Sequence, residues 1–162
     1  MSIEELIRTI QYTQDCVALS RNGLPKISGN GLALPADVQE FYHLCGGVGL
    51  FQSAAYAIII VPPQNVVPAN PVIIGEQIED DVSSCWYIIA KGDNRECLTI
   101  DLSEARLGRC YDSFYDLHPG NSPIIAFSFT ELLTSLLRNQ GQHWYWLRDE
   151  KFNLGNAYDY VV

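Results

Sequence analysis

The side chains of this 162-residue chain that could act as nucleophiles, bases or soft metal ligands are five cysteines and three histidines. They are Cys16, Cys45, Cys85, Cys97, Cys110, His43, His118 and His143. A cysteine hydrolase needs a thiol, a base and an orienting group, and two combinations can be written, Cys110–His118–Asp116 and Cys45–His43. The second fails on geometry, because residues two apart on a helix point to different faces. The first places its histidine in a Pro-Gly loop, where a surface imidazole is ordinary. We therefore predict no catalytic residue and keep a small Cys-dependent hydrolase as the least favoured function.

The spacing of the same side chains also disfavours a metal site or a disulfide framework. The cysteine count is odd, no two cysteines are spaced C-x-x-C, and there is no H-E-x-x-H pair. The acidic run at residues 79–81 lacks the alternating ligands and the glycine of a calcium loop. Several cysteines lie inside apolar runs, where a free thiol packs as a small hydrophobe. We predict no metal, no cofactor and a reducing, cytoplasmic compartment.

Acidic side chains are distributed unevenly along the chain. The net charge is −9, and no Lys or Arg occurs between Lys26 and Lys91. The carboxylates of that stretch are Asp37, Glu40, Glu76, Glu79, Asp80 and Asp81. Direct nucleic-acid binding is not expected, because a phosphate-backbone binder normally presents a basic face, whereas an acidic field attracts basic partners. Two interpretations remain open. The charge serves solubility alone, or a loop carrying the last four of these carboxylates contacts a basic partner.

No segment is expected to enter a membrane. Residues 1–10 carry Glu4, Glu5 and Arg8, which excludes a signal peptide. The apolar run at residues 54–61 is too short to span a bilayer. With 48% hydrophobic and 18% charged residues, the composition indicates one globular domain over residues 1–162.

Two helices are predicted before the sheet. Ser2 and Glu5 form a capping box ahead of an apolar stripe, which predicts a helix over residues 3–13. Pro35 suits the first residue of a second helix, and apolar side chains at three- and four-residue steps continue it. These side chains are Leu34, Val38, Phe41, Tyr42 and Cys45. The two glycines at residues 46–47 are expected to end this helix in the left-handed conformation.

Short apolar runs separated by turn residues predict the strands of an antiparallel sheet. The expected strands cover residues 56–61, 86–90, 97–100, 109–111 and 124–127. Residues 72–84 are ambiguous between a strand and an exposed acidic loop. A capping box at residues 128–131 begins a last helix that carries four leucines. The order α-α-β(n)-α predicts an α+β fold, in which a sheet of about five or six strands packs against N-terminal and C-terminal helices.

The segment 143–162 is rich in aromatic side chains. They include Trp144, Tyr145, Trp146, Phe152, Tyr158 and Tyr160. Trp and Tyr are overrepresented in interface hot spots, but they are also large core residues. Core packing is the favoured interpretation, and Trp144 and Trp146 are kept as candidates for partner contact.

Two blocks of short motifs occur in a fixed order. The first consists of Leu34-Pro35, Phe41-Tyr42 and Gly46-Gly47. The second consists of Trp86 to Ala90, Gly92-Asp93, Leu98 to Asp101, Gly108 to Tyr111, Ile125 to Phe129 and Leu132-Leu133. In this order and at this spacing they resemble the SUKH superfamily over about residues 35–138. The chain departs from the family pattern at Cys45, where Asn is common, at Lys91, and in the aromatic segment 143–162.

The SUKH superfamily includes bacterial immunity proteins of polymorphic toxin systems and a fungal cell-wall assembly regulator. The resemblance implies a non-enzymatic α+β domain that binds other proteins. In bacteria it implies a protein that neutralises a toxin domain, often a nuclease or a deaminase. Together with the charge distribution, it favours an immunity protein for a basic toxin domain, and the alternative is a regulatory scaffold without a toxin partner. A homo-oligomer formed through an uncovered edge strand is left open.

Overall fold

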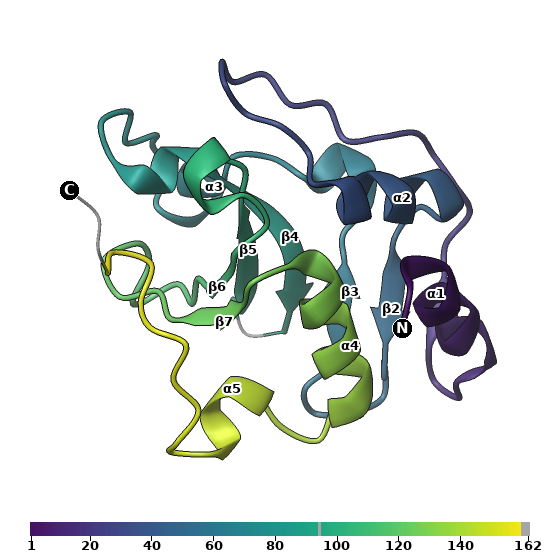
Figure 1. The fold of residues 1–162 in the computed structure, drawn as a ribbon. Helices are drawn as coiled ribbons and strands as arrows, with labels where there is room; N and C mark the ends of the chain where they lie inside the picture. Colours follow the sequence, from purple (N-terminus) through teal and green to yellow (C-terminus); the bar gives the residue numbers. More distant parts are fainter. Residues whose placement is uncertain (94, 160–162) are drawn as a thin grey trace.

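The computed structural model describes residues 1–93 and 95–159, and within them seven strands form one antiparallel sheet (Figure 1). The strands lie side by side in chain order. They are β1 Val17–Ala18, β2 Val48–Leu50, β3 Ile58–Ile60, β4 Trp86–Gly92, β5 Cys97–Asp101, β6 Cys110–Asp112 and β7 Ile124–Ala126. The helices are α1 Ile3–Tyr12, α2 Ala36–Leu44, α3 Ala69–Ile73, α4 Phe129–Asn139 and α5 Tyr145–Arg148, with 3-10 turns η1 Pro63–Asn65, η2 Val82–Cys85 and η3 Glu104–Arg106. The predicted α+β fold, with helices at both ends of the chain, is confirmed.

The sheet has more strands than the predicted five or six, because β1 and β2 extend its N-terminal edge. β1 is two residues long and pairs Val17 with Gly49 of β2. A strand of two residues shows no alternation that a sequence pattern could detect. β2 follows directly on the two glycines at residues 46–47, and its run of three residues is too short for the sequence to indicate a strand.

The N-terminal helix follows its sequence signals closely. The Ser2 hydroxyl accepts from the backbone N–H of Glu5 at 3.1 Å, and the Glu5 carboxylate accepts from the N–H of Ser2 at 2.7 Å. This confirms the capping box. The apolar stripe of α1 is buried.

The second helix ends differently from the prediction. α2 stops at Leu44, and Cys45 is already extended, with φ −152°. The neighbouring glycine, Gly46, lies so close to the Ser20 carbonyl that a Cβ would approach its oxygen to 2.1 Å. Gly46 is therefore required by the close approach of another segment, and the predicted left-handed cap is wrong for it. Gly47 does have a positive φ of 117°, but it lies beyond the extended Cys45 and not at the helix end.

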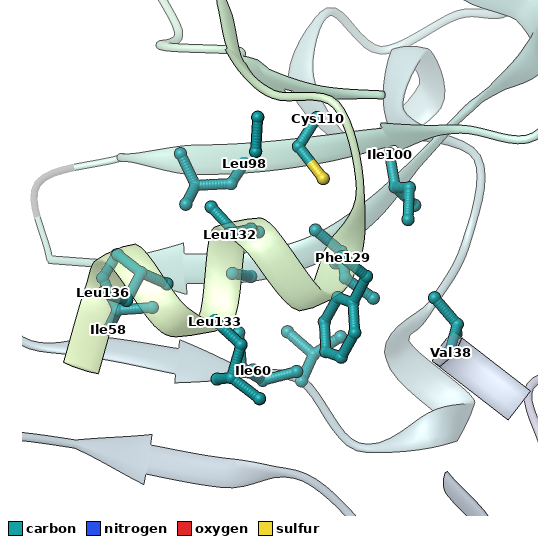
Figure 2. Close-up of a cluster of buried hydrophobic side chains, with 14 of the residues drawn as sticks. Val38, Ile58, Ile60, Leu98, Ile100, Cys110, Phe129, Leu132, Leu133 and Leu136 are labelled. Atoms are coloured by element: carbon teal, nitrogen blue, oxygen red, sulfur yellow. The ribbon is translucent and has the colours of Figure 1, made fainter. Parts of the chain in front are cut away.

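One face of the sheet is covered by α4 through apolar contacts (Figure 2). Phe129 and Leu132 of α4 point toward strand residues that share this face. The strand residues are Ile58, Ile60, Leu98, Ile100 and Cys110. α2 contributes Val38 and Phe41 to the same buried cluster. Burial of this many apolar side chains is the main stabilising term of the fold.

The opposite face of the sheet is covered by α3, η2 and the loop 113–120, and its buried side chains are aromatic and polar. Trp86 and Tyr111 contact each other there, with ring centroids 4.5 Å apart. The Tyr111 hydroxyl donates to the buried Asp101 carboxylate at 2.6 Å, and Arg106 pairs with the same carboxylate at 3.3 Å. The segment 72–84, ambiguous in sequence, forms the end of α3, an acidic loop and η2, so its strand alternative is wrong.

Candidate protein-binding surface

The acidic loop, residues 74–81, joins α3 to η2 and carries the four carboxylates that the sequence suggested for partner contact. The side chains of Glu76, Glu79 and Asp80 are exposed. Both ion pairs found among the described residues lie elsewhere, so these three carboxylates have no cationic partner there. They form a local negative surface that favours the approach of basic groups.

The fourth carboxylate, Asp81, accepts hydrogen bonds from other residues of the chain. It accepts hydrogen bonds from the backbone N–H of Ser83 at 3.1 Å, from the Ser83 hydroxyl, and from the Tyr158 hydroxyl at 2.7 Å. Partial burial acts to raise the pKa of Asp81, but these hydrogen bonds outweigh it and hold the pKa below its ordinary value. Asp81 thus caps η2 and ties it to the C-terminal segment, and we do not count it among the exposed charges.

Asn70 of α3 is hydrogen-bonded to Gln77 in the middle of the acidic loop. Its side chain is fully buried. Its Nδ2 donates to Gln77 Oε1 at 3.1 Å and to Ser83 Oγ at 2.9 Å. Gln77 Oε1 also accepts from the backbone N–H of Ile78 at 3.2 Å. The Asn70 side chain therefore contacts the acidic loop at Gln77 and the following turn, η2, at Ser83.

His118 is buried, although its Pro-Gly context indicated a surface position. It is 7% exposed, its Nε2 donates to Asn70 Oδ1 at 2.6 Å, and its ring meets Trp86 edge-on. Burial lowers the pKa of His118 to about 4, so the imidazole is neutral near pH 7. The sequence pattern located a turn correctly, but a turn does not reveal which of its side chains points inward.

These hydrogen bonds form one directional chain. His118 donates to Asn70, Asn70 to Ser83, and Ser83 to Asp81. Hydrogen bonds that run the same way polarise one another and so strengthen the chain. The chain links the loop 113–120, α3 and η2, and Asn70 and Asp81 connect it to the acidic loop. A loop that is ordered by such contacts has less conformational entropy to lose on binding.

The two candidate tryptophans of the C-terminal segment differ in availability. Trp146 is 4% exposed, and its Nε1 donates to Asp112 Oδ2 at 2.9 Å. It belongs to the core, as the favoured interpretation expected, and is not available to a partner. Trp144 is partly buried, stacked on Trp146 and edge-on to Tyr56. Trp144 remains a candidate for partner contact, and Tyr160 lies outside the described residues.

A pair of buried carboxyl groups was missed by sequence reasoning. Glu96 and Asp112 are both buried and neighbour each other on the side of the sheet where Trp146 of α5 donates to Asp112 Oδ2. Burial, and then the neighbouring Asp112, raise the pKa of Glu96 well above its ordinary value. Each carboxyl group keeps one oxygen without a partner among the described residues. Glu96 lies directly before β5 and Asp112 ends the neighbouring strand β6, and no spacing in the sequence indicates that they meet.

The structure does not bring a thiol and an imidazole together in either combination considered above. Cys110 lies on the face of the sheet that α4 covers (Figure 2), whereas His118 lies on the opposite face. His43 is exposed, and Cys45 is buried. Burial raises the pKa of the Cys45 and Cys110 thiols, which disfavours the thiolate that a nucleophile needs.

Among the described residues, no cluster of three or more His, Cys, Asp or Glu side chains is arranged to hold a metal ion. No helix in the described part of the chain has the length and apolar character needed to cross a membrane.

Comparison with known proteins gives two matches. Residues 29–135 match the family model described as SMI1 / KNR4 family (SUKH-1). The chain is also 50% identical over 161 residues to a Bacillus subtilis (strain 168) protein named immunity protein YokJ, a match that covers 98% of this chain and 97% of YokJ. The family match includes the acidic loop, Asn70 and His118.

Proposed function

The chain belongs to the SMI1/KNR4 (SUKH-1) family, and from this premise we propose that it is an immunity protein that neutralises a toxin domain by stoichiometric binding. The relative named immunity protein YokJ supports this, because half of its residues are identical over nearly its whole length. The observation that carries the proposal in the structure is the acidic loop, a set of exposed carboxylates held rigid by a buried hydrogen-bond chain.

In this proposal the acidic loop faces a basic surface of the toxin. Glu76, Glu79 and Asp80 are exposed and lack a cationic partner in the described part of the chain. Opposite charges accelerate encounter and orient the two proteins before contact. Asp81 does not face the toxin in this proposal; its hydrogen bonds to Ser83 and Tyr158 fix η2 at the end of the acidic loop.

Neutralisation then follows from occlusion of the toxin, without any covalent step. An interface of about 1,200–2,000 Å² is the usual size for a stable complex of this kind. On this account the chain has no catalytic activity, works in the cytoplasm and acts as one domain. The buried apolar cluster, which extends from α1 to Ala157, supports the one-domain reading.

On this proposal a toxin gene neighbours this chain's gene, and the test uses that toxin domain, purified in an inactivated form. We would reverse three charges, Glu76→Lys, Glu79→Lys and Asp80→Lys, and measure the association rate constant at low and high salt. The triple variant should associate about tenfold more slowly at low salt, and the difference should shrink at high salt.

The matched control reverses three exposed carboxylates elsewhere, Glu40→Lys, Glu104→Lys and Glu150→Lys, with the same change in net charge. It should slow association far less. Equal slowing in the two triple variants would remove the acidic loop from the interface. Absence of any complex with the wild-type chain would contradict the immunity proposal and favour a regulatory scaffold.

A further inference from the structure

A cavity of about 290 Å³ opens where α3 meets the β4–β5 hairpin, and α3 leads directly into the acidic loop. One wall comes from Val72 and Ile73 of α3, and another from Tyr115 of the loop 113–120. The remaining lining residues are Lys91, Gly92, Arg95, Glu96 and Cys97. The volume is at the lower limit of small-molecule sites, which suits a side chain better than a cofactor.

The mouth of the cavity is unusually apolar for an exposed position. Val72 is 48% exposed and Tyr115 is 46% exposed, and both line the cavity. Ile74, the first residue of the acidic loop, is also an exposed apolar side chain, as is Leu117 in the loop 113–120. Exposed apolar side chains that gather around a concavity, with charged residues at the rim, mark protein-binding sites.

The two apolar walls are fixed relative to each other. Asn70 and His118 join α3 to the loop 113–120 through the 2.6 Å hydrogen bond. Asn70 also holds Gln77 in the acidic loop. The same buried amide therefore positions both the cavity and the charges beside it, so that a partner would find the two features at a constant separation.

Negative and positive side chains lie on different sides of the cavity. The carboxylates of the acidic loop follow the α3 wall, while Lys91 and Arg95 stand on the hairpin side. The Arg95 guanidinium lies over the Tyr115 ring, 4.7 Å from its centroid, and this contact engages its charge. The thiol of Cys97 forms part of the apolar lining, because burial raises its pKa and keeps it protonated.

We propose that this cavity is the anchor site for one apolar side chain of the toxin, donated by a segment whose basic residues lie against the acidic loop. This inference rests on the proposed function and specifies the partner's chemistry at the same surface. An anchor buried in a pocket governs dissociation, whereas rim charges govern association. The two parts of the surface are thus separable in one kinetic experiment.

The variant to test is Val72→Gln with Tyr115→Gln, which makes the mouth polar without changing the net charge. With the same inactivated toxin domain, the dissociation rate constant should rise about tenfold or more, while the association rate constant should change less than about twofold. The control is Leu44→Gln with Leu107→Gln, two exposed apolar residues outside the cavity, and its kinetics should match the wild type.

A second measurement does not depend on any variant. Methyl resonances of Val72 and Ile73 in the wild-type chain should shift when the toxin domain is added. Unchanged dissociation of the double variant, or unshifted methyl resonances in a complex that does form, would overturn the anchor site and leave the proposed function standing. If the wild-type chain forms no complex with the toxin domain, the proposed function fails and this inference fails with it.

Discussion

On the α4 face, the sheet is covered by side chains such as Phe129 and Leu132, which belong to one buried apolar cluster (Figure 2). On the opposite face, the side chains that cover the sheet include Asn70 of α3, Ser83 of η2 and His118 of the loop 113–120. Hydrogen bonds with defined donors and acceptors join these three residues. Apolar burial is non-directional and tolerates small rearrangements. Hydrogen bonds between buried groups allow few alternative geometries, and leaving one unmade is costly. The difference indicates that the α4 face supplies stability, whereas the α3 face fixes the position of a surface.

The largest effect should come from the apolar face. Phe41 of α2 is fully buried, and its ring lies 4.9 Å from those of Tyr42 and Phe129. Phe41→Ala should lower the free energy of unfolding by about 3–5 kcal/mol, measured by urea denaturation. A loss below about 1 kcal/mol would show that this face is not the main source of stability.

A smaller loss, with a local signature, is expected from the polar face. Asn70→Ala leaves the buried His118 N–H without its acceptor and removes the donor from Gln77 of the acidic loop and Ser83 of η2, which should cost about 2–3 kcal/mol. Amide hydrogen exchange over residues 74–81 should accelerate more than in Val38→Ala, a destabilising control in α2. Equal exchange in the two variants would mean that Asn70 does not hold the acidic loop.

Glu96 and Asp112 are buried carboxyl groups on the side of the sheet that α4 and α5 cover, where the other buried side chains are mostly apolar. The folded pKa of Glu96 is raised above the ordinary value of 4.5, so its contribution is most favourable below that pH and is lost as pH rises. Glu96→Gln removes the ionisation and should stabilise the protein by about 2 kcal/mol at pH 8, and by less at pH 5. Thermal denaturation at both pH values checks this, and a variant destabilised more at pH 8 than at pH 5 would contradict it.

His118 gives the opposite pH dependence on the α3 face. Its pKa falls from 6.5 to about 4 on folding, so its contribution is complete above pH 6.5 and is lost as pH falls toward 4. Between pH 7.5 and 5.5 this amounts to about 1 kcal/mol. His118→Gln keeps a donor for Asn70 but does not titrate, so the stability difference between variant and wild type should shift in favour of the variant on acidification. A difference that stays constant with pH would place His118 in contact with solvent.

The sequence was informative for one face of the sheet and poor for the other. Three- and four-residue apolar steps located α1, α2 and α4, because packing against a sheet requires a continuous apolar stripe. The partners of Asn70 on the α3 face come from segments that are distant in sequence and have no common period. His118 and the Glu96–Asp112 pair were misjudged or missed for the same reason.

The candidate surface was predicted in part. Charge counting found Glu76, Glu79 and Asp80, since a run of exposed carboxylates is visible without a fold. It could not separate Asp81, whose hydrogen-bond partner Tyr158 lies near the end of the described chain. The cavity was not predicted, because its walls come from α3, the β4–β5 hairpin and the loop 113–120.

The most direct test of the account is hydrogen exchange of the wild-type chain, free and in complex with the inactivated toxin domain from the neighbouring gene. The account predicts that complex formation slows exchange at residues 72–80 and 113–118, the two segments joined by Asn70 and His118. Slower exchange confined to α1, α2 or α5, with no change at residues 72–80, would contradict the claim that the α3 face binds the partner.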